Sequence, residues 1–220
     1  MSKLQLLFYH VYSLYFCLRY LPFKQAVKIP ILIHPHVRAE LKRGGVIMAG
    51  HIRRSMVSIG FDCAKGRSNC KSLLSVNPKN DAKLYLHSGV IIAKGTRIIV
   101  DNGVMEIGND FFCNGDCSFY CNTSINIGNS NMYGWDVHFN TTNGHPFYID
   151  GKQVSMSDEI RIGDHVWIGS NTKISKGTDL ASECVVAQCS LVNNRFHEEH
   201  CLIGGIPAKV IKENVCWTRK

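Results

Sequence analysis

The sequence predicts an all-β protein: a parallel β-helix of hexapeptide repeats, with an N-terminal helix and one extruded loop. Three observations support this fold class. Aliphatic side chains recur at every sixth position, residues 3–21 are apolar and aromatic without that period, and residues 146–161 interrupt it. The length of 220 residues and the hydrophobic content of 45% suit one or two globular domains with a sizeable core.

The first segment, residues 1–45, is predicted to be helical and basic. The whole net charge of +8 lies within residues 1–54, which hold nine of the 25 Lys and Arg but one of the 17 acids. Because the basic charge is confined to this end, we expect no nucleic-acid partner. Residues 3–21 are too short and too interrupted to span a membrane. Two interpretations stay open: residues 3–28 lie in the interface of an anionic membrane, or they pack on the core or on a neighbouring subunit.

The ten cysteines are expected to be free thiols in a cytoplasmic protein, peripheral to the inner face of the membrane if residues 3–28 bind it. No small-residue cleavage site follows the apolar segment, so we expect no secretory signal and no oxidising compartment. Cys113, Cys117 and Cys121 are spaced by four, unlike zinc or iron–sulfur motifs. The string 197-HEEHC-201 has its two histidines three apart, one short of the zinc-protease spacing. We therefore expect no metal site.

The six-residue period identifies the second segment, residues 46–213. Neither the helical period of 3.6 nor the strand period of 2 produces a clean six, whereas each strand and corner of a β-helix supplies one inward side chain. Six consecutive inward positions are Ile162, Ile168, Ile174, Leu180, Val186 and Val192. Three earlier triplets are Leu86, Ile92 and Ile98; Ile107, Cys113 and Phe119; and Ile127, Tyr133 and Phe139. Residues 86–197 thus predict about five triangular coils of 18 residues, with a looser beginning at 46–85 and a tail at 214–220.

Residues 146–161 fall between two coils and must leave the prism as a loop. Extruded loops on a rigid scaffold often carry function.

Three segments in this order give the sequence a specific resemblance: 143-NGHPF-147, 162-IGDHVWIGS-170 and 204-GGIPAKVIK-212. Over roughly residues 100–213 the chain resembles the left-handed β-helix acyltransferases, in particular the galactoside and maltose O-acetyltransferases and the O-acetyltransferases of capsular and lipopolysaccharide sugars. The resemblance implies a left-handed coil, acetyl-CoA as co-substrate and a sugar or oligosaccharide acceptor. It also implies a homotrimer with active sites between subunits.

The same resemblance assigns the reactive groups. Acetylating a sugar hydroxyl requires a base, and imidazole titrates in the right range. The histidine of the Gly-His-Pro segment, His145, is implied as that base. Asn114 falls where the galactoside enzymes have an asparagine that lines the catalytic and acceptor site. Asn122 falls where they have an acceptor-binding aspartate, and this departure leaves the acceptor's identity open; both asparagines could equally be turn residues.

The remaining matched positions concern the coenzyme. Trp167 matches a tryptophan beside the acetyl-CoA channel, although an aromatic residue there could also lie at a subunit interface. Positions that match the lining of the pantetheine arm are Ser170, Gln188, Asn193 and Asn194. Lys209 and Lys212 match basic residues that meet coenzyme phosphates, a role that flexible point charges suit.

The leading hypothesis is therefore an acetyl-CoA-dependent O-acetyltransferase acting on a surface polysaccharide or its precursor. One alternative with the same fold is a metalloenzyme like the γ-carbonic anhydrases, which would need His138, His145 and His165 around a metal. The other is a non-catalytic β-helix scaffold, which would not bind coenzyme A.

Overall fold

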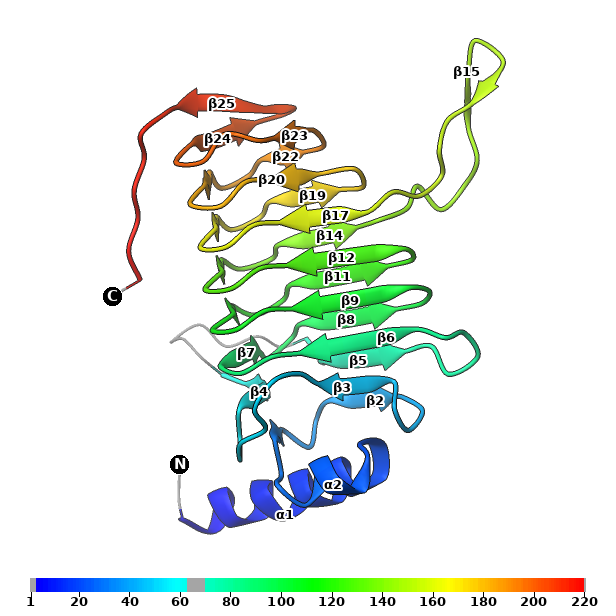
Figure 1. The fold of residues 1–220 in the computed structure, drawn as a ribbon, viewed down its shortest axis with the longest axis vertical. Helices are drawn as coiled ribbons and strands as arrows, with labels where there is room; N and C mark the ends of the chain where they lie inside the picture. The colour runs from blue at the N-terminus through cyan, green and yellow to red at the C-terminus, as the bar shows by residue number, and fades with distance from the viewer. Residues whose placement is uncertain (1–2, 63–69, 220) are drawn as a thin grey trace.

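A computed structural model describes residues 3–62 and 70–219 as a triangular prism of stacked coils with a helix at its base (Figure 1). Three parallel sheets form its sides, and the chain visits them in the order A, B, C in each coil.

Sheet A contains β1 (Ile31–Ile33), β4 (Val57–Phe61), β7 (Val90–Ala93), β10 (Phe112–Cys113), β13 (Met132–Tyr133), β18 (Trp167–Ile168), β21 (Val185–Val186), β24 (Leu202–Gly205) and the antiparallel β25 (Ala208–Lys212). Sheet B contains β2 (Arg38–Glu40), β5 (Leu73–Val76), β8 (Arg97–Val100), β11 (Ser118–Cys121), β14 (His138–Asn140), β19 (Lys173–Ser175) and β22 (Leu191–Val192). Sheet C contains β3 (Val46–Met48), β6 (Lys83–Leu86), β9 (Val104–Ile107), β12 (Ser124–Ile127), β17 (Ile160–Ile162), β20 (Asp179–Leu180) and β23 (Arg195–Phe196). The corners between the sheets stack into three long edges, here named the A–B, B–C and C–A edges.

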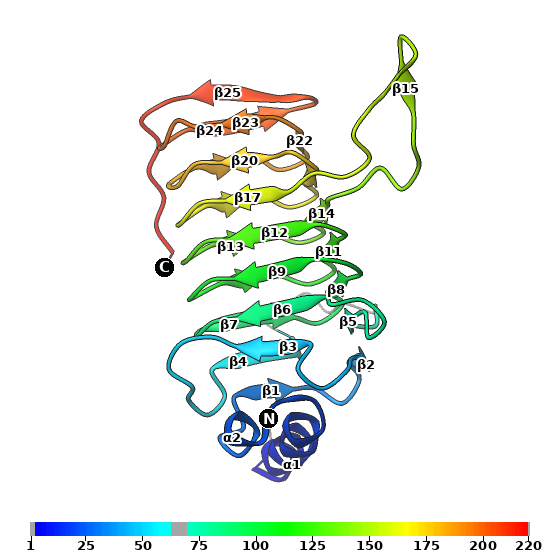
Figure 2. The same ribbon diagram turned by 45° about the vertical axis from the view of Figure 1, so that its right-hand side comes forward.

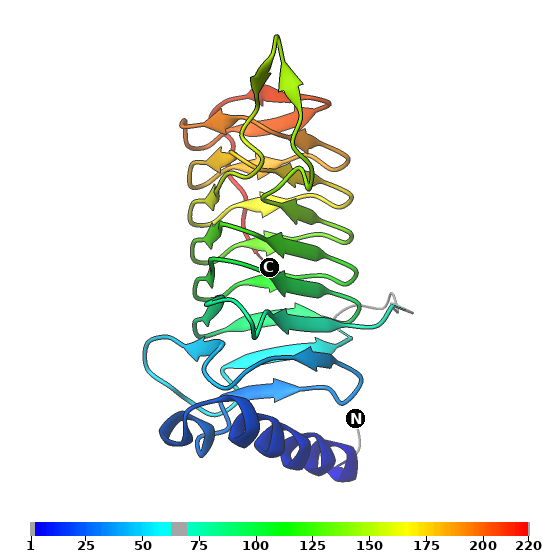
Figure 3. The same cartoon turned by 90° about the vertical axis from the view of Figure 1, so that its right-hand side faces the viewer.

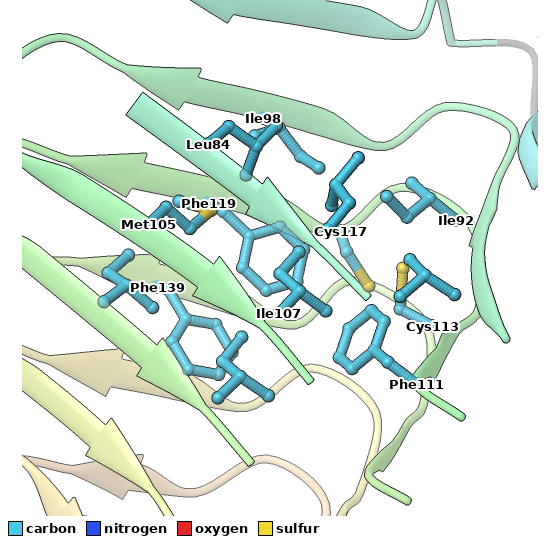
Figure 4. Close-up of a cluster of buried hydrophobic side chains, with 14 of the residues drawn as sticks. Leu84, Ile92, Ile98, Met105, Ile107, Phe111, Cys113, Cys117, Phe119 and Phe139 are labelled. Atoms are coloured by element: carbon cyan, nitrogen blue, oxygen red, sulfur yellow. The ribbon is translucent and has the colours of Figure 1, made fainter. Parts of the chain in front are cut away.

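The six-residue period is confirmed by the burial of the side chains. All fifteen inward positions named above are at most 4% exposed, and each triplet gives one residue to each sheet. Their side chains fill the prism, where Ile107 of sheet C and the neighbouring Phe119 and Phe139 of sheet B all point inward (Figure 4). The rings of Phe119 and Phe139 stack at a centroid distance of 5.0 Å. The six-residue period therefore identifies the side chains that point into the prism.

The coil length differs from a uniform 18 residues. Trp167 pairs with Val185, eighteen positions on, but Phe112 pairs with Met132, twenty positions on. The longer coils take their extra residues at the B–C edge, where Cys121 supplies a second buried side chain. The spacing of 18 residues relates β17 to β20, β18 to β21 and β19 to β22, whereas the last coil is shorter, with Val185 opposite Leu202.

The N-terminal helix closes the base of the prism. Helix α1 (Lys3–Tyr20) ends just before Pro22, and α2 (Phe23–Ala26) follows it. Phe16 and Cys17 on its inner face are buried in the same core as the coils. The Oγ of Ser13 accepts a hydrogen bond of 2.9 Å from the backbone N–H of Ile33. The helix therefore packs on the protein through one face (Figure 3).

The predicted boundary at residue 45 is too late. Strand β1 already pairs with β4, and β2 pairs with β5, so the first coil begins at Ile31. Ile31 and Ile33 point inward and are buried, as residues of a coil are. The sequence did not reveal this coil because no repeat precedes it. Within the described residues, 3–62 and 70–219, neither helix is long and apolar enough to cross a membrane.

The cysteines agree with the expectation of free thiols. The structure shows free thiols at Cys17, Cys113, Cys117, Cys121, Cys184, Cys189, Cys201 and Cys216, while Cys63 lies outside the described residues. Cys113 fills an inward position, as predicted. Burial raises the pKa of the Cys17 thiol and of the Cys121 thiol to about 11, which makes both unreactive near neutral pH.

Candidate functional site

The A–B edge carries a groove of about 490 Å³ that brings four of the predicted site residues together. These four are Asn114, Trp167, Ser170 and Gln188. The groove runs from the coil of β10 to that of β24, so it is long and follows the prism axis. One wall comes from sheet A, where Met132, Trp167 and Val185 lie opposite one another in successive strands and precede inward residues.

Glycines allow neighbouring coils to approach each other closely at the floor of the groove. A Cβ on Gly134 would lie 2.5 Å from Ser170 Oγ and 2.6 Å from Ser170 N, and a Cβ on Gly169 would lie 2.6 Å from Gln188 N. The coils can approach this closely only without those side chains. Ser170 Oγ is held in place by the backbone N–H of Trp135, which donates to it at 3.0 Å. The floor is therefore backbone and small polar groups.

Two predicted cations lie at the upper end of the groove. Lys209 and Lys212 are exposed on β25, the strand that folds back along β24. Lys212 lies opposite Leu202, whose side chain lines the groove. Lys209 lies opposite Gly204 of β24, so both lysines belong to the strand that flanks the upper end of the groove.

His145 lies elsewhere, on the loop that leaves the B–C edge. The loop departs after β14 and returns at β17, with a bridge between Thr142 and Ser157 and a hairpin of β15 (Tyr148–Ile149) and β16 (Lys152–Gln153). It starts a few residues before the predicted 146, so His145 is inside it and exposed. In Figure 2 the loop projects well away from the coils.

Three further predicted residues share this B–C edge. Asn193 and Asn194 are exposed between β22 and β23, outside the groove. Asn122 is partly buried, and its Nδ2 donates to Asp101 Oδ2 at 3.4 Å, while Ser157 Oγ donates to its Oδ1 at 3.5 Å. Asn122 thus joins the prism to the base of the loop that carries His145.

The predicted set is therefore divided between two edges of one chain. The coenzyme candidates, except Asn193 and Asn194, follow the A–B edge with Asn114, whereas His145 and Asn122 belong to the B–C edge. Within one chain, the groove lining therefore does not include His145.

The geometry does not support a three-histidine metal site. His138 Nε2 pairs with Asp136 at 2.7 Å on sheet B, and His165 Nδ1 pairs with Glu183 at 2.6 Å on the C–A edge. Together with His145 they occupy three separate places. No group of three His, Cys, Asp or Glu side chains suited to a metal occurs in residues 3–62 and 70–219. The 197-HEEHC-201 string is a corner whose first four side chains are exposed, as expected of a polar loop.

Some residues of the two edges escaped the sequence reasoning. Met132 and Val185 could have been found, because each stands one position before an inward residue, as Trp167 does. Asp101 also had a signal, since it occupies the B–C edge one coil before Asn122 and accepts a hydrogen bond of 2.7 Å from Asn77. Trp217 gave no such signal in the sequence, because it lies outside the repeats.

No protein-family model matches the sequence. Over 149 residues the chain is 31% identical to an uncharacterized 24.8 kDa protein in the cps region of Klebsiella pneumoniae, which covers 68% of this chain and 66% of the relative. It is 31% identical over 132 residues to the polysialic acid O-acetyltransferase of Escherichia coli O1:K1 / APEC, covering 59% of this chain and 41% of that one. The polysialic acid O-acetyltransferase of Neisseria meningitidis is 34% identical over 109 residues, 49% of this chain and 51% of its own. The matches thus span less than two thirds of each of these relatives.

Two solved structures share the architecture. The polysialic-acid-specific acetyltransferase NeuO matches 87% of this chain and 90% of its own, with a TM-score of 0.53 and 20% identity. The polysialic acid O-acetyltransferase OatWY matches 86% and 87%, with a TM-score of 0.50 and 24% identity. At these identities the likeness is one of fold. The coils therefore have the left-handed β-helix fold of these two structures, and the chain is a homologue of the polysialic acid O-acetyltransferases.

Proposed function

We propose that the protein transfers an acetyl group from acetyl-CoA to a hydroxyl of a sugar in a surface polysaccharide or its precursor. The observation that carries this proposal is the groove of the A–B edge, which gathers Asn114, Trp167, Ser170 and Gln188. Its length, its largely apolar walls and the two lysines at its upper end suit an extended thioester arm with phosphates at one end. The named activities of the relatives support the same reaction.

In the proposed reaction His145 is the general base. A nitrogen of its ring removes the proton of the acceptor hydroxyl while the oxygen attacks the thioester carbonyl. A carbon–oxygen bond forms, the carbon–sulfur bond breaks, and the imidazolium returns the proton to the departing thiolate. The Asn114 amide, in the groove wall, can donate to the carbonyl oxygen as negative charge develops there. Transfer is direct, with no acetyl-cysteine intermediate, because the described residues that line the groove include no cysteine.

The other predicted residues take binding roles in this proposal. Trp167 packs against the pantetheine arm, Ser170 and Gln188 offer polar contacts to its amides, and Lys209 and Lys212 bind the phosphates. Asn122 and Asp101 bind acceptor hydroxyls beside the loop. Asn193 and Asn194, on the same edge as the loop, meet the coenzyme of the adjoining subunit.

We further propose a homotrimer, on the ground that His145 and the groove lie on different edges. In a threefold assembly the loop of one protomer can extend to the groove of the next. The complete site then lies between two chains, and a single chain is inactive.

The first experiment substitutes the base. His145→Ala should reduce kcat/KM for acetyl transfer by about 10²- to 10⁴-fold, the range for loss of a general base, while coenzyme A still binds. His197→Ala, at another exposed histidine, is the matched control and should keep its activity. Retention of more than about a tenth of wild-type kcat/KM in His145→Ala would refute the assignment.

A second experiment tests the shared site. Gln188→Trp should obstruct the groove from an exposed position and inactivate the protein while leaving His145 intact. Refolding His145→Ala and Gln188→Trp together in equal amounts should restore about a quarter of wild-type activity, because random trimers pair an intact groove with an intact loop at that frequency. Persistent inactivity of well-formed mixed trimers would place the site within one chain.

The outer face of α1 supports a peripheral membrane association. An apolar stripe at helical spacing, 57–78% exposed, consists of Leu4, Leu7, Phe8, Val11 and Tyr15. Arg19, Lys24 and Lys28 are exposed close by in the chain. Apolar side chains flanked by bases match an interface with anionic headgroups, and we propose that the base of the prism lies on the inner face of the membrane.

Vesicle binding tests this orientation. The full chain should bind phosphatidylglycerol vesicles, with binding that weakens as salt rises. Leu7→Glu with Phe8→Glu should abolish binding, whereas Val104→Glu, at an exposed apolar residue of β9, should not. Point substitutions are preferable to truncation because the inner face of α1 is part of the core. Failure of the wild type to bind, with a smaller assembly in the Leu7/Phe8 variant, would instead make the stripe a contact between copies.

A further inference from the structure

The C-terminal tail, residues 213–219, runs down the C–A edge on the opposite side of the prism from the loop (Figure 1). Near its start, the backbone N–H of Val215 donates to the carbonyl of His200 at 2.7 Å. Near its end, the Arg219 guanidinium lies 5.0 Å from the centre of the Phe112 ring and donates to the Asp110 carbonyl at 3.4 Å. The tail therefore spans the same coils of sheet A as the groove does, along the other edge of that sheet.

Trp217 is the residue that anchors the tail. It is 9% exposed, whereas Cys216 and Thr218 on either side are exposed. Its indole stacks on the imidazole of His165 at 4.1 Å and 12°, and its Nε1–H donates to the His165 carbonyl at 2.9 Å. Glu183 holds the other side of His165 through the 2.6 Å contact to Nδ1. The position of the Trp217 indole is thus fixed by stacking and by a directional hydrogen bond.

The anchored indole lies beside the groove residue Trp167. The two indole rings are 6.1 Å apart at 44°. Trp167 is 39% exposed, follows His165 by two residues and borders the groove on its sheet A side. Without Trp217, the Trp167 side chain would face solvent on the side toward the C–A edge and could adopt other rotamers.

We propose that Trp217 is a positioning residue: through its contact with Trp167 it orients the aromatic wall of the groove against the pantetheine arm of the acyl-CoA. This inference rests on the proposed function. The tail, anchored outside the repeats, in this way sets the affinity of a site that it does not line.

The test measures coenzyme affinity separately from catalysis. Trp217→Ala should raise the Kd for coenzyme A, by calorimetry, and the KM for acetyl-CoA roughly two- to tenfold, the worth of one aromatic contact, with kcat nearly unchanged. Trp217→Phe, which keeps the ring but loses the N–H donor, should recover part of the affinity. Thr218→Ala, at the exposed neighbour, is the control and should match the wild type.

A double-mutant cycle shows whether the effect passes through Trp167. In a Trp167→Ala background, Trp217→Ala should no longer change the Kd for coenzyme A, because the two residues act as one unit. Additive effects, or a lower Tm with an unchanged Kd, would overturn the inference and would show that the tail only stabilises the fold. If Trp217→Ala does not fold, Trp217→Phe with Trp167→Phe completes the cycle. A wild type that binds no coenzyme A would overturn the proposed function as well.

Discussion

The coils and the extruded loop show two ways in which this chain positions side chains. In the coils, the Cα of each residue is fixed by its place in the six-residue period, and its neighbours above and below occupy equivalent places. The loop of residues 141–159 is supported only at its base: its hairpin is exposed, whereas hydrogen bonds join Thr142 and Asn143 to Met156 and Asp158 to Thr141. We therefore expect the coils to determine stability and to build the groove, and the loop, which carries the proposed base His145, to contribute little to stability.

The sharpest test of this division compares two phenylalanines. Phe119 is fully buried among Phe111, Tyr133 and Phe139, whereas Phe147 in the loop is 44% exposed. Phe119→Ala should lower the free energy of unfolding by about 3–5 kcal/mol, the usual loss for a core phenylalanine. Phe147→Ala should change it by less than about 0.5 kcal/mol. Chemical denaturation measures both, and a comparable loss in the two variants would show that the loop packs on the coils.

A pair of glycines tests the geometry of the groove. A Cβ on Gly134 would meet Ser170, and the forced shift should cost about 1–3 kcal/mol and weaken coenzyme A binding. Gly151, in the hairpin turn, has open space around its Cβ but a φ of +75°, so Gly151→Ala should cost about 1–2 kcal/mol within the hairpin alone. We expect Gly134→Ala to lower the global Tm and Gly151→Ala to leave it unchanged. Unaltered coenzyme affinity in Gly134→Ala would mean that the coils separate freely at this edge.

A pair of tyrosines gives a smaller effect of opposite sign. Tyr133 is fully buried, and its hydroxyl has no hydrogen-bond partner among the described residues. Burial also raises the pKa of this hydroxyl well above its usual value, with Cys113 and Cys117 adding to the shift. Tyr133→Phe should therefore stabilise the protein by about 1 kcal/mol, or roughly 2–4 °C in Tm. Tyr148→Phe, in the exposed hairpin, should have no effect. A lower Tm in Tyr133→Phe would indicate a buried water bound to the hydroxyl.

The same comparison explains what could be predicted from the sequence. The period separates inward from outward positions, which is a local property, so the three sheets followed from it, whereas the groove residues Trp167, Ser170 and Gln188 were identified through the family resemblance. The resemblance supplied their proposed roles and that of His145. The first coil was missed because residues 31–48 contain one turn without a preceding repeat.

The parts that could not be predicted depend on contacts between distant segments. Trp217 docks on His165 through stacking and a hydrogen bond that no spacing encodes. The division of the predicted site between the A–B and B–C edges was likewise not predicted. The repeat distinguishes inward from outward residues, but it does not state how far an extruded loop lies from residues on another edge. The resemblance implies a site between subunits, and the separation of the two edges is the ground on which we propose it.

The last prediction concerns the junction of α1 with the coils, where two histidines are partly buried. The His34 ring packs against Tyr9 of the helix at 5.0 Å and against Phe61 at 5.3 Å, and His36 Nε2 lies 3.1 Å from Ser72 Oγ. Burial lowers the pKa of both histidines from 6.5; the positive charge of Lys94 lowers both further, and Asp62 opposes the shift.

The sign of the pH effect follows from the two states of the chain. Between the lowered pKa and about 6.5, the unfolded chain binds more protons at these histidines than the folded chain does, so the free energy of unfolding falls as the pH falls through this window. Thermal unfolding at pH 7.5, 6.5 and 5.5 should show this loss, and a variant with His34→Asn and His36→Asn should lose less over the same range. Hydrogen exchange should place the loosened amides in α1 and β1 rather than in the central coils. Equal pH slopes for the two proteins would mean that the helix junction does not carry the acid sensitivity, and that α1 is as firmly attached as the coils are to one another.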